Sequence, residues 1–142
     1  IEVSRAFYQT VLGLEVILDF GANITMTGGI SMQSRASWLE FIHKPEQDIV
    51  FGGNDAELYF EEEEFDGFLE KLKNTKDISF VHEVKEHSWG QRVIRFYDPD
   101  RHIIEVGEDM IRVVRRFISS GLSVEETAKR MDVPMDYVKS CL

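Results

Sequence analysis

The sequence predicts an α+β fold in which two tandem βαβββ units precede an all-helical C-terminal tail. The order helix–strand–strand–strand occurs twice, over about 50 residues each time, which indicates a repeat of one unit. After residue 108 every segment has helical character, and the formal charge changes from −8 over residues 55–108 to +1 over residues 109–142. The 142 residues are 43% apolar, so the chain can bury a hydrophobic core. We expect units at 1–54 and 55–108, and the tail at 109–142.

The first unit is expected to begin with a helix over residues 1–12. Val3, Phe7 and Val11 recur every four residues and form one apolar face. Gly13 is a typical residue just beyond a helix end. Three strands rich in aliphatic residues follow, separated by glycine turns, at 14–20, 24–27 and 30–33. A short apolar helix and a loop complete this unit, at 38–42 and 44–54.

The second unit repeats this order but opens with a strand, over residues 57–61. Its helix, over residues 65–72, has four apolar residues on one face, namely Phe65, Phe68, Leu69 and Leu72. Three strands follow, at 78–84, 91–97 and 102–106. Asp98-Pro99-Asp100-Arg101 is a strong turn signal, because proline presets φ at the second turn position. Since only this unit opens with a strand, we expect the first strand of unit one to lie upstream of Ile1.

The tail from Gly121 to Leu142 resembles the helix-turn-helix pattern of bacterial regulators. Ser123 and Glu126 have the spacing of a capping box, and Asp132-Val133-Pro134 predicts the turn. Two residues of the first tail helix are expected to pack inward, Ala128 and Met131. The predicted second helix offers few side chains that read base edges, since it carries Asp136, Tyr137, Lys139 and Ser140. We therefore expect the tail to pack on the domain or on a dimer mate.

Composition excludes several classes of function. The net charge is −10, which argues against a general nucleic-acid binder and against binding to anionic lipid. No apolar run approaches the roughly 20 residues of a membrane span, and no signal peptide is visible. The single cysteine, Cys141, excludes an intramolecular disulfide and a cysteine-based zinc cluster. These features favour a cytoplasmic protein.

Two stretches carry a resemblance to a known family. Ser4-Arg5-Ala6-Phe7-Tyr8, leading to the Leu12-Gly13 corner, is similar to its opening helix. Residues 96–106, with Asp98-Pro99-Asp100 and Glu105, are similar to its closing hairpin. On these residues the chain resembles the vicinal oxygen chelate superfamily, which includes glyoxalase, bleomycin-resistance and ring-cleaving dioxygenase proteins. The resemblance covers residues 1–108. It implies that the two units form a cleft, that single-domain members dimerise, and that enzymatic members hold a divalent metal ion there.

The resemblance assigns candidate metal ligands. Glu105 matches the final-strand glutamate of the family, and Glu57 stands where most metal-binding members have histidine. The other interpretation is that Glu105 is a hydrogen-bonded cleft residue and Glu57 a solvated acid at a strand edge. Two carboxylates that lie close together repel each other unless a cation is present. Either a cation lies between them, such as one nickel, zinc, manganese or iron ion, or the two side chains do not converge.

Three further residues are candidates for ligand binding. Gln33 shares a strand face with Ser31, which aligns with a metal ligand of the family although serine is a poor ligand. His87-Ser88-Trp89-Gly90 resembles a loop that borders the cleft in bleomycin-resistance-like members, with Ser88 in place of proline. An indole at that place can stack on a flat or cationic ligand. The other interpretation is that Trp89 caps the core and that His87 is solvated.

These observations favour a cytoplasmic homodimer that binds a small molecule in its cleft, as a diverged or metal-free member of the family. The negative charge fits a cationic ligand. The alternative is a divalent-metal-dependent lyase or isomerase, or a dioxygenase, in which Glu105 and Glu57 hold the metal ion. A third hypothesis is a regulator whose cleft senses a ligand and whose tail binds DNA, which the acidity disfavours.

Overall fold

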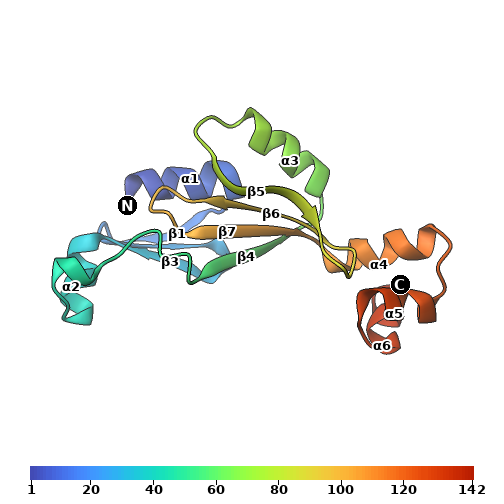
Figure 1. The fold of residues 1–142 in the computed structure, drawn as a ribbon. Helices are drawn as coiled ribbons and strands as arrows, with labels where there is room; N and C mark the ends of the chain where they lie inside the picture. The colour runs from blue at the N-terminus through green and yellow to red at the C-terminus, as the bar shows by residue number, and fades with distance from the viewer. The chain divides into compact units, whose positions relative to one another are not determined.

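The computed structural model describes residues 1–142 and confirms the α+β fold class, with two sheets and C-terminal helices (Figure 1). The chain divides into two compact units. One contains residues 1–56 and 98–102, and the other contains residues 57–97 and 103–142. None of the helices combines the length and the hydropathy that a transmembrane span requires.

The first unit has one helix beside a three-stranded antiparallel sheet. Helix α1 (Glu2–Leu12) buries Tyr8 and Val11 and ends at Gly13, whose φ of 70° is left-handed as expected. The strands lie in the order β1-β2-β3, with bounds Val16–Asp19, Asn23–Met26 and Ile30–Gln33. Three short helices complete the unit: η1 (Thr27–Gly29), α2 (Arg35–Ile42) and η2 (Glu46–Asp48).

The predicted turn that begins at Asp98 packs with the first unit. Its carboxylate accepts hydrogen bonds from the Tyr8 hydroxyl at 3.0 Å and from the His102 backbone N–H at 2.8 Å. Ser4 Oγ donates to Asp100 at 3.0 Å. Burial and the neighbouring Asp98 raise the pKa of Tyr8 well above its usual value. These bonds satisfy the buried polar groups that the turn places against α1.

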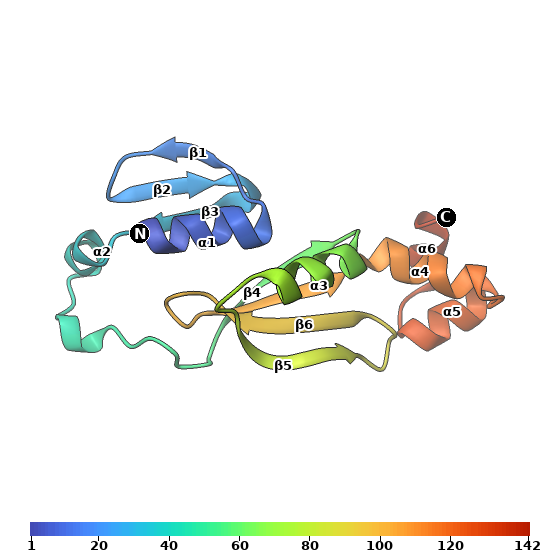
Figure 2. The ribbon, with the colours of Figure 1, turned by 90° about the horizontal axis from the view of Figure 1, so that it is seen from above.

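The second unit is a four-stranded sheet covered on one face by a helix. The strand order is β4-β7-β6-β5, in which β4 and β7 are parallel and the other pairs are antiparallel. The strands span Glu57–Glu62, Ser79–Glu86, Arg92–Tyr97 and Ile103–Glu108 for β4, β5, β6 and β7. Helix α3 (Phe65–Asn74) lies along this sheet (Figure 2), and Phe68 packs on Phe96 of β6. The opposite face carries the alternate residues of each strand.

The tail forms three helices with a core of their own. They are α4 (Met110–Ser119), α5 (Val124–Met131) and α6 (Met135–Ser140). The buried cluster includes Ala128 and Met131, as predicted, together with Val113, Val114, Val138 and Cys141. The expected capping box of Ser123 and Glu126 is present. The tail belongs to the same compact unit as the four-stranded sheet.

Candidate functional site

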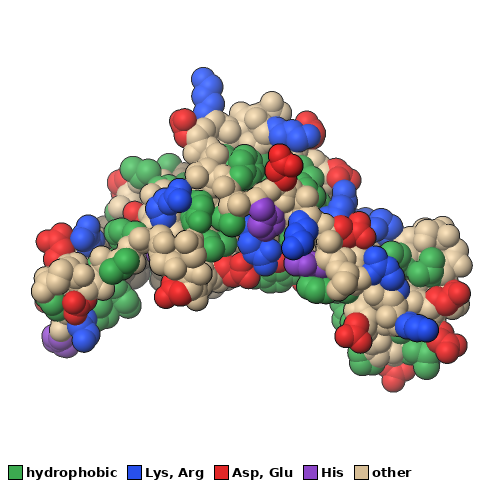
Figure 3. Space-filling view, in the orientation of Figure 1, with side chains coloured by type: hydrophobic (Ala, Val, Ile, Leu, Met, Phe, Trp, Pro, Cys, Tyr) green, Lys and Arg blue, Asp and Glu red, His purple; other side chains and the backbone are tan.

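A row of four polar or aromatic side chains crosses the face of the second sheet opposite α3. In the strand register Tyr59 of β4 lies beside Glu105 of β7, Glu105 beside Arg95 of β6, and Arg95 beside His82 of β5. Glu57 shares this face because it precedes Tyr59 by two residues on β4. Figure 3 shows histidine and basic side chains next to one another over these strands. The register thus brings two acids, a guanidinium, an imidazole and a phenol together.

The guanidinium of Arg95 lies between the two predicted metal ligands. Arg95 Nε donates to Glu57 Oε2 at 2.8 Å, and Nη2 lies 3.5 Å from Glu57 Oε1. Nη2 also donates to Glu105 Oε2. Arg95 Nη1 lies 3.3 Å from His82 Nε2. The two carboxylates therefore converge, and the cation between them belongs to the protein.

The two carboxyl groups differ in their affinity for protons. Hydrogen bonds from Arg95 lower the pKa of Glu57, whose side chain is 37% exposed. Burial and the neighbouring Glu57 raise the pKa of Glu105, whose side chain is only 7% exposed. The carboxylate of Glu57 in turn raises the pKa of Arg95. Compared with free side chains, the folded structure thus favours the ionised form of Glu57 and disfavours that of Glu105.

The residues as arranged do not fit a divalent metal ion. Metal ligands of this type must be deprotonated oxygens or neutral imidazole nitrogens free to coordinate. Here Arg95 donates to both carboxylates and lies against the imidazole of His82. No group of three His, Cys, Asp or Glu side chains is arranged to hold a metal ion. The guanidinium also places a positive charge where such an ion would be.

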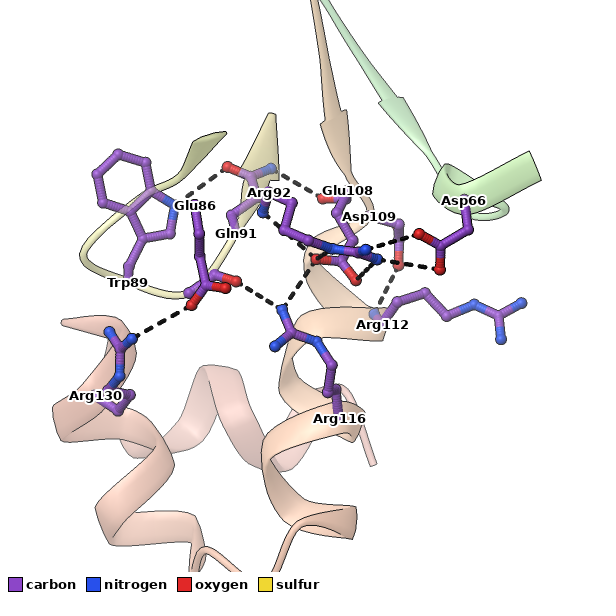
Figure 4. A network of polar contacts seen from close by, with 11 residues as sticks. Asp66, Glu86, Trp89, Gln91, Arg92, Glu108, Asp109, Arg112, Arg116 and Arg130 are labelled. Carbon is purple, nitrogen blue, oxygen red and sulfur yellow. Dashed lines mark hydrogen bonds and ion pairs between the residues drawn. The ribbon is translucent and has the colours of Figure 1, made fainter. Parts of the chain in front are cut away.

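The predicted ligand-binding residues Trp89 and His87 lie in the β5–β6 turn and contact each other. Their rings stack with centroids 4.1 Å apart. Trp89 Nε1 donates to Gln91 Oε1 at 3.1 Å (Figure 4), and the indole packs against the core of the tail helices. Burial and nearby positive charges, including Arg95, lower the pKa of His87. The Trp89 indole is thus in contact with the protein on two sides, through the His87 ring and through the core of the tail helices.

Gln91 connects this turn to the row on the sheet face. Its Nε2 donates to Tyr59 Oη at 2.8 Å and to the Glu108 carbonyl at 2.9 Å, and Tyr59 donates to Glu61 at 3.0 Å. Burial raises the pKa of Tyr59 to about 12. Gly107 makes this crossing possible, because a Cβ there would lie 2.7 Å from Gln91 Nε2 and 3.1 Å from the Tyr59 ring.

The remaining candidate, Gln33, lies at the end of β3 in the first unit. Its side-chain oxygen accepts a hydrogen bond from Asn23 at 2.8 Å, and its Nε2 donates to Ser37 Oγ. Asn23 is its cross-strand partner on β2. These bonds hold the amide within the first unit. The structure thus brings Glu57 and Glu105 together, places Trp89 and His87 at the tail, and places Gln33 in the other compact unit.

A buried carboxylate joins the sheet to the tail (Figure 4). Glu108 accepts from Arg92 Nη2 at 3.1 Å and from Arg116 Nη2 of α4 at 3.0 Å. Arg92 also pairs with Asp66 of α3 at 2.7 Å, and Arg116 donates to the Gly90 carbonyl at 2.6 Å. The two arginines hold the pKa of Glu108 below its usual value, although burial opposes this. Sheet, α3 and tail are thus fixed to one another by one charge network.

Sequence reasoning did not find Arg95 or the Glu108 network. Arg95 stands in a strand that was recognised, and a hairpin register that places it opposite Glu105 would have identified it. Glu108 lies at the boundary between unit and tail, where each partner comes from a different element. Arg116 lies on helix α4, eight residues beyond Glu108. Its partner could not be read from local spacing.

Comparisons with known proteins agree with this fold. The sequence profile of the Glyoxalase-like domain matches residues 1–111. An Agrobacterium tumefaciens crystal structure, described as a protein of unknown function, is 35% identical with a TM-score of 0.69, over 77% of this chain and 85% of that one. No curated protein matches the chain.

Two more distant structures share the fold. A glyoxalase/bleomycin resistance protein/dioxygenase from Nocardioides is 21% identical, with a TM-score of 0.60, over 75% of this chain and 74% of that chain. A lactoylglutathione lyase from Agrobacterium tumefaciens is 19% identical, with a TM-score of 0.58, over 78% of this chain and 86% of that chain. Most of the tail lies beyond the residues matched by the domain profile.

Proposed function

Because this chain belongs to the glyoxalase-like family, we propose that it binds a small molecule on the sheet face that carries Glu57, Arg95 and Glu105. The observation that supports this proposal is the position of the Arg95 guanidinium between the two carboxylates. A site whose central cation is a side chain has no need of a divalent ion to hold the two acids together. The chain then acts as a metal-free binding member of the family.

The exposed groups of this face favour a cationic aromatic ligand. Tyr59 is 47% exposed, and Glu57 beside it is partly open to solvent. A ring face attracts a cation, and a carboxylate next to it adds a charge-assisted hydrogen bond. The chain's net charge of −10 also attracts cations over longer distances.

The alternative function is a metal-dependent lyase, isomerase or dioxygenase. It requires a divalent ion at Glu57 and Glu105, where the guanidinium lies. The lactoylglutathione lyase is only 19% identical in sequence to this chain, so its structural likeness supports the shared fold alone. Retention of a divalent ion by the purified wild-type protein would favour this alternative. Homodimerisation remains a prediction, which light scattering of the purified chain tests.

Thermal shift and calorimetric titration with simple probes test the proposed function. Benzamidine and tyramine supply a positive charge on an aromatic ring, and benzoate is the matched anion. We expect the two cations to bind and benzoate not to bind. Glu57→Gln should weaken cation binding by roughly tenfold, which corresponds to about 1.4 kcal/mol. Glu70→Gln, an exposed acid on α3 paired with Lys73, is the control and should leave binding unchanged. Equal binding of benzoate, or unchanged binding in Glu57→Gln, would overturn the proposal.

A further inference from the structure

The β5–β6 turn contacts the tail helices on one side and the proposed ligand face on the other. Trp89 of this turn packs against the core of the tail helices. The Phe117 ring of α4 lies so close to Gly90 that a Cβ at this position would clash with it. The next residue, Gln91, donates a hydrogen bond to Tyr59 of the ligand face. The turn is therefore a direct physical connection between the tail and the ligand face.

The side-chain amide of Gln91 is buried, and groups that can bond in only one sense fix its orientation (Figure 4). The indole N–H of Trp89 can only donate, so it must face Gln91 Oε1, which lies 3.1 Å away. The backbone carbonyl of Glu108 can only accept, so it must face Gln91 Nε2, at 2.9 Å. The second N–H of the amide is then directed at Tyr59 Oη, at 2.8 Å.

The amide has a second connection to the tail through Glu108. The carbonyl of Glu108 accepts from Gln91, and its carboxylate accepts from Arg116 of α4 at 3.0 Å. The helix that contacts Gly90 through Phe117 thus also binds the residue that anchors the Gln91 amide. A displacement of α4 would therefore disturb both partners that orient this amide.

The amide in turn holds the Tyr59 phenol in place. Tyr59 Oη accepts from Gln91 and donates its own hydrogen to Glu61, at 3.0 Å. Gly107 lies against the Tyr59 ring. These contacts restrict a side chain that is 47% exposed. A side chain that is already held in its binding position loses less conformational freedom when a ligand binds, so the affinity for the ligand is higher.

We infer that Gln91 is a positioning residue of the ligand site, and that through Trp89 it couples ligand binding at Tyr59 to the docking of the helical tail. The inference rests on the proposed function and goes beyond it, because it assigns a regulatory role to a tail that lies mostly outside the matched domain. Such coupling is reciprocal. The docked tail favours ligand binding, and the ligand stabilises the docked tail.

Nuclear magnetic resonance of the indole N–H groups tests this coupling, with benzamidine as the probe. The chain has two tryptophans, so Trp38→Phe identifies the Trp89 signal. Hydrogen bonds in a chain polarise one another, so saturating benzamidine should shift the Trp89 signal of the wild type. Gln91→Leu removes the connection. In that variant the shift should disappear, while benzamidine still binds roughly threefold to tenfold more weakly.

A pair of tryptophan substitutions supplies the matched comparison. Trp89→Phe keeps an aromatic ring against the tail but removes the indole N–H, and it serves also if Gln91→Leu does not fold. It should weaken benzamidine binding in calorimetric titration by roughly threefold to tenfold. Trp38→Phe is the control and should leave binding unchanged, because Trp38 is exposed on α2 of the other compact unit.

Two results with bound benzamidine would overturn the inference. One is a Trp89 signal that stays unchanged in the wild type. The other is a shift that persists in Gln91→Leu, because the ligand would then reach Trp89 by another route. Tyr59→Phe without any ligand separates this inference from the proposed function. Loss of the hydroxyl should shift the Trp89 signal, and an unchanged signal would overturn the coupling. Failure of benzamidine to bind counts against the proposed function alone.

Discussion

Arg95 Nε lies 2.8 Å from Glu57 Oε2, and the same guanidinium also donates to Glu105 on the neighbouring strand. The chain thus carries its own positive charge at the position where the family resemblance implies a metal ion. This arrangement satisfies the buried Glu105 and prevents two acids from facing each other unpaired. The proposed metal-free function rests on this arrangement.

Replacement of Arg95 by alanine should lower the free energy of unfolding by about 1–3 kcal/mol, because it leaves the buried Glu105 without its charged partner. Arg95→Lys should cost less, since it restores a positive charge but not the two-sided contact. Urea unfolding at neutral pH measures both. A loss in Arg95→Lys as large as that in Arg95→Ala would show that guanidinium packing, and not charge, matters here.

Glu108→Gln should destabilise the chain by about 1–3 kcal/mol at neutral pH, because Arg92 and Arg116 then share no carboxylate. The pKa of Glu108 is lowered from 4.5 in the folded state, so its contribution is complete above that value and is lost as the pH falls through the lower folded pKa. Urea unfolding from pH 7 down to pH 3 tests this. A difference between wild type and variant that persists unchanged in acid would contradict the assigned role of Glu108.

Gly107→Ala should destabilise the chain by about 1–3 kcal/mol, since the new Cβ meets the Gln91 amide and the Tyr59 ring. It should also disturb the Tyr59 phenol, whose pKa of about 12 is measurable by ultraviolet titration. Gly67→Ala on α3 is the matched substitution, because nothing lies within 4 Å of its Cβ. That change should stabilise the chain by about 0.5–1 kcal/mol. Equal effects at both positions would refute the close contact at Gly107.

Gly90→Ala should separate the tail from the β5–β6 turn. The new Cβ would clash with the Phe117 ring of α4, and the φ of 87° at this position is unfavourable for alanine. Gly121→Ala has a similar backbone penalty, with φ of 102°, but meets no neighbour. We expect faster hydrogen exchange over α4 to α6 in Gly90→Ala than in Gly121→Ala. Identical exchange in the two variants would show that Phe117 does not anchor the tail there.

The sequence predicted the helices and strands well because the residues that mark their ends lie close together in the chain. Gly13 ends α1 and Ser123 with Glu126 begins α5, and each depends on residues within one turn of helix. The succession of strands along the chain of the second unit also followed from turn residues such as Pro99. The sequence left two possibilities for Glu57 and Glu105, namely a cation between them or no convergence. The family resemblance identified both residues as candidates.

Arg95 faces Glu105 only in one pairing register of β6 and β7, and a shift of one residue would separate them. The expected strand starting at His102 would place Tyr97 opposite His102, and Glu105 opposite Ile94. In the structure Asp98 accepts the His102 N–H, which keeps His102 in the turn and pairs Tyr97 with Ile103. Arg95 then faces Glu105 on the same side of the sheet. A slip of one residue reverses the face of every side chain, so local propensity could not settle this contact.

The most direct test of the central claim is the divalent metal content of wild-type protein purified without chelators, measured by elemental analysis beside Glu105→Ala. If Arg95 supplies the cation, neither protein should hold a stoichiometric divalent ion, even after incubation with excess nickel, zinc, manganese or iron. About one ion per chain in the wild type, lost in Glu105→Ala, would contradict the claim. It would assign Glu105 to a metal-dependent site.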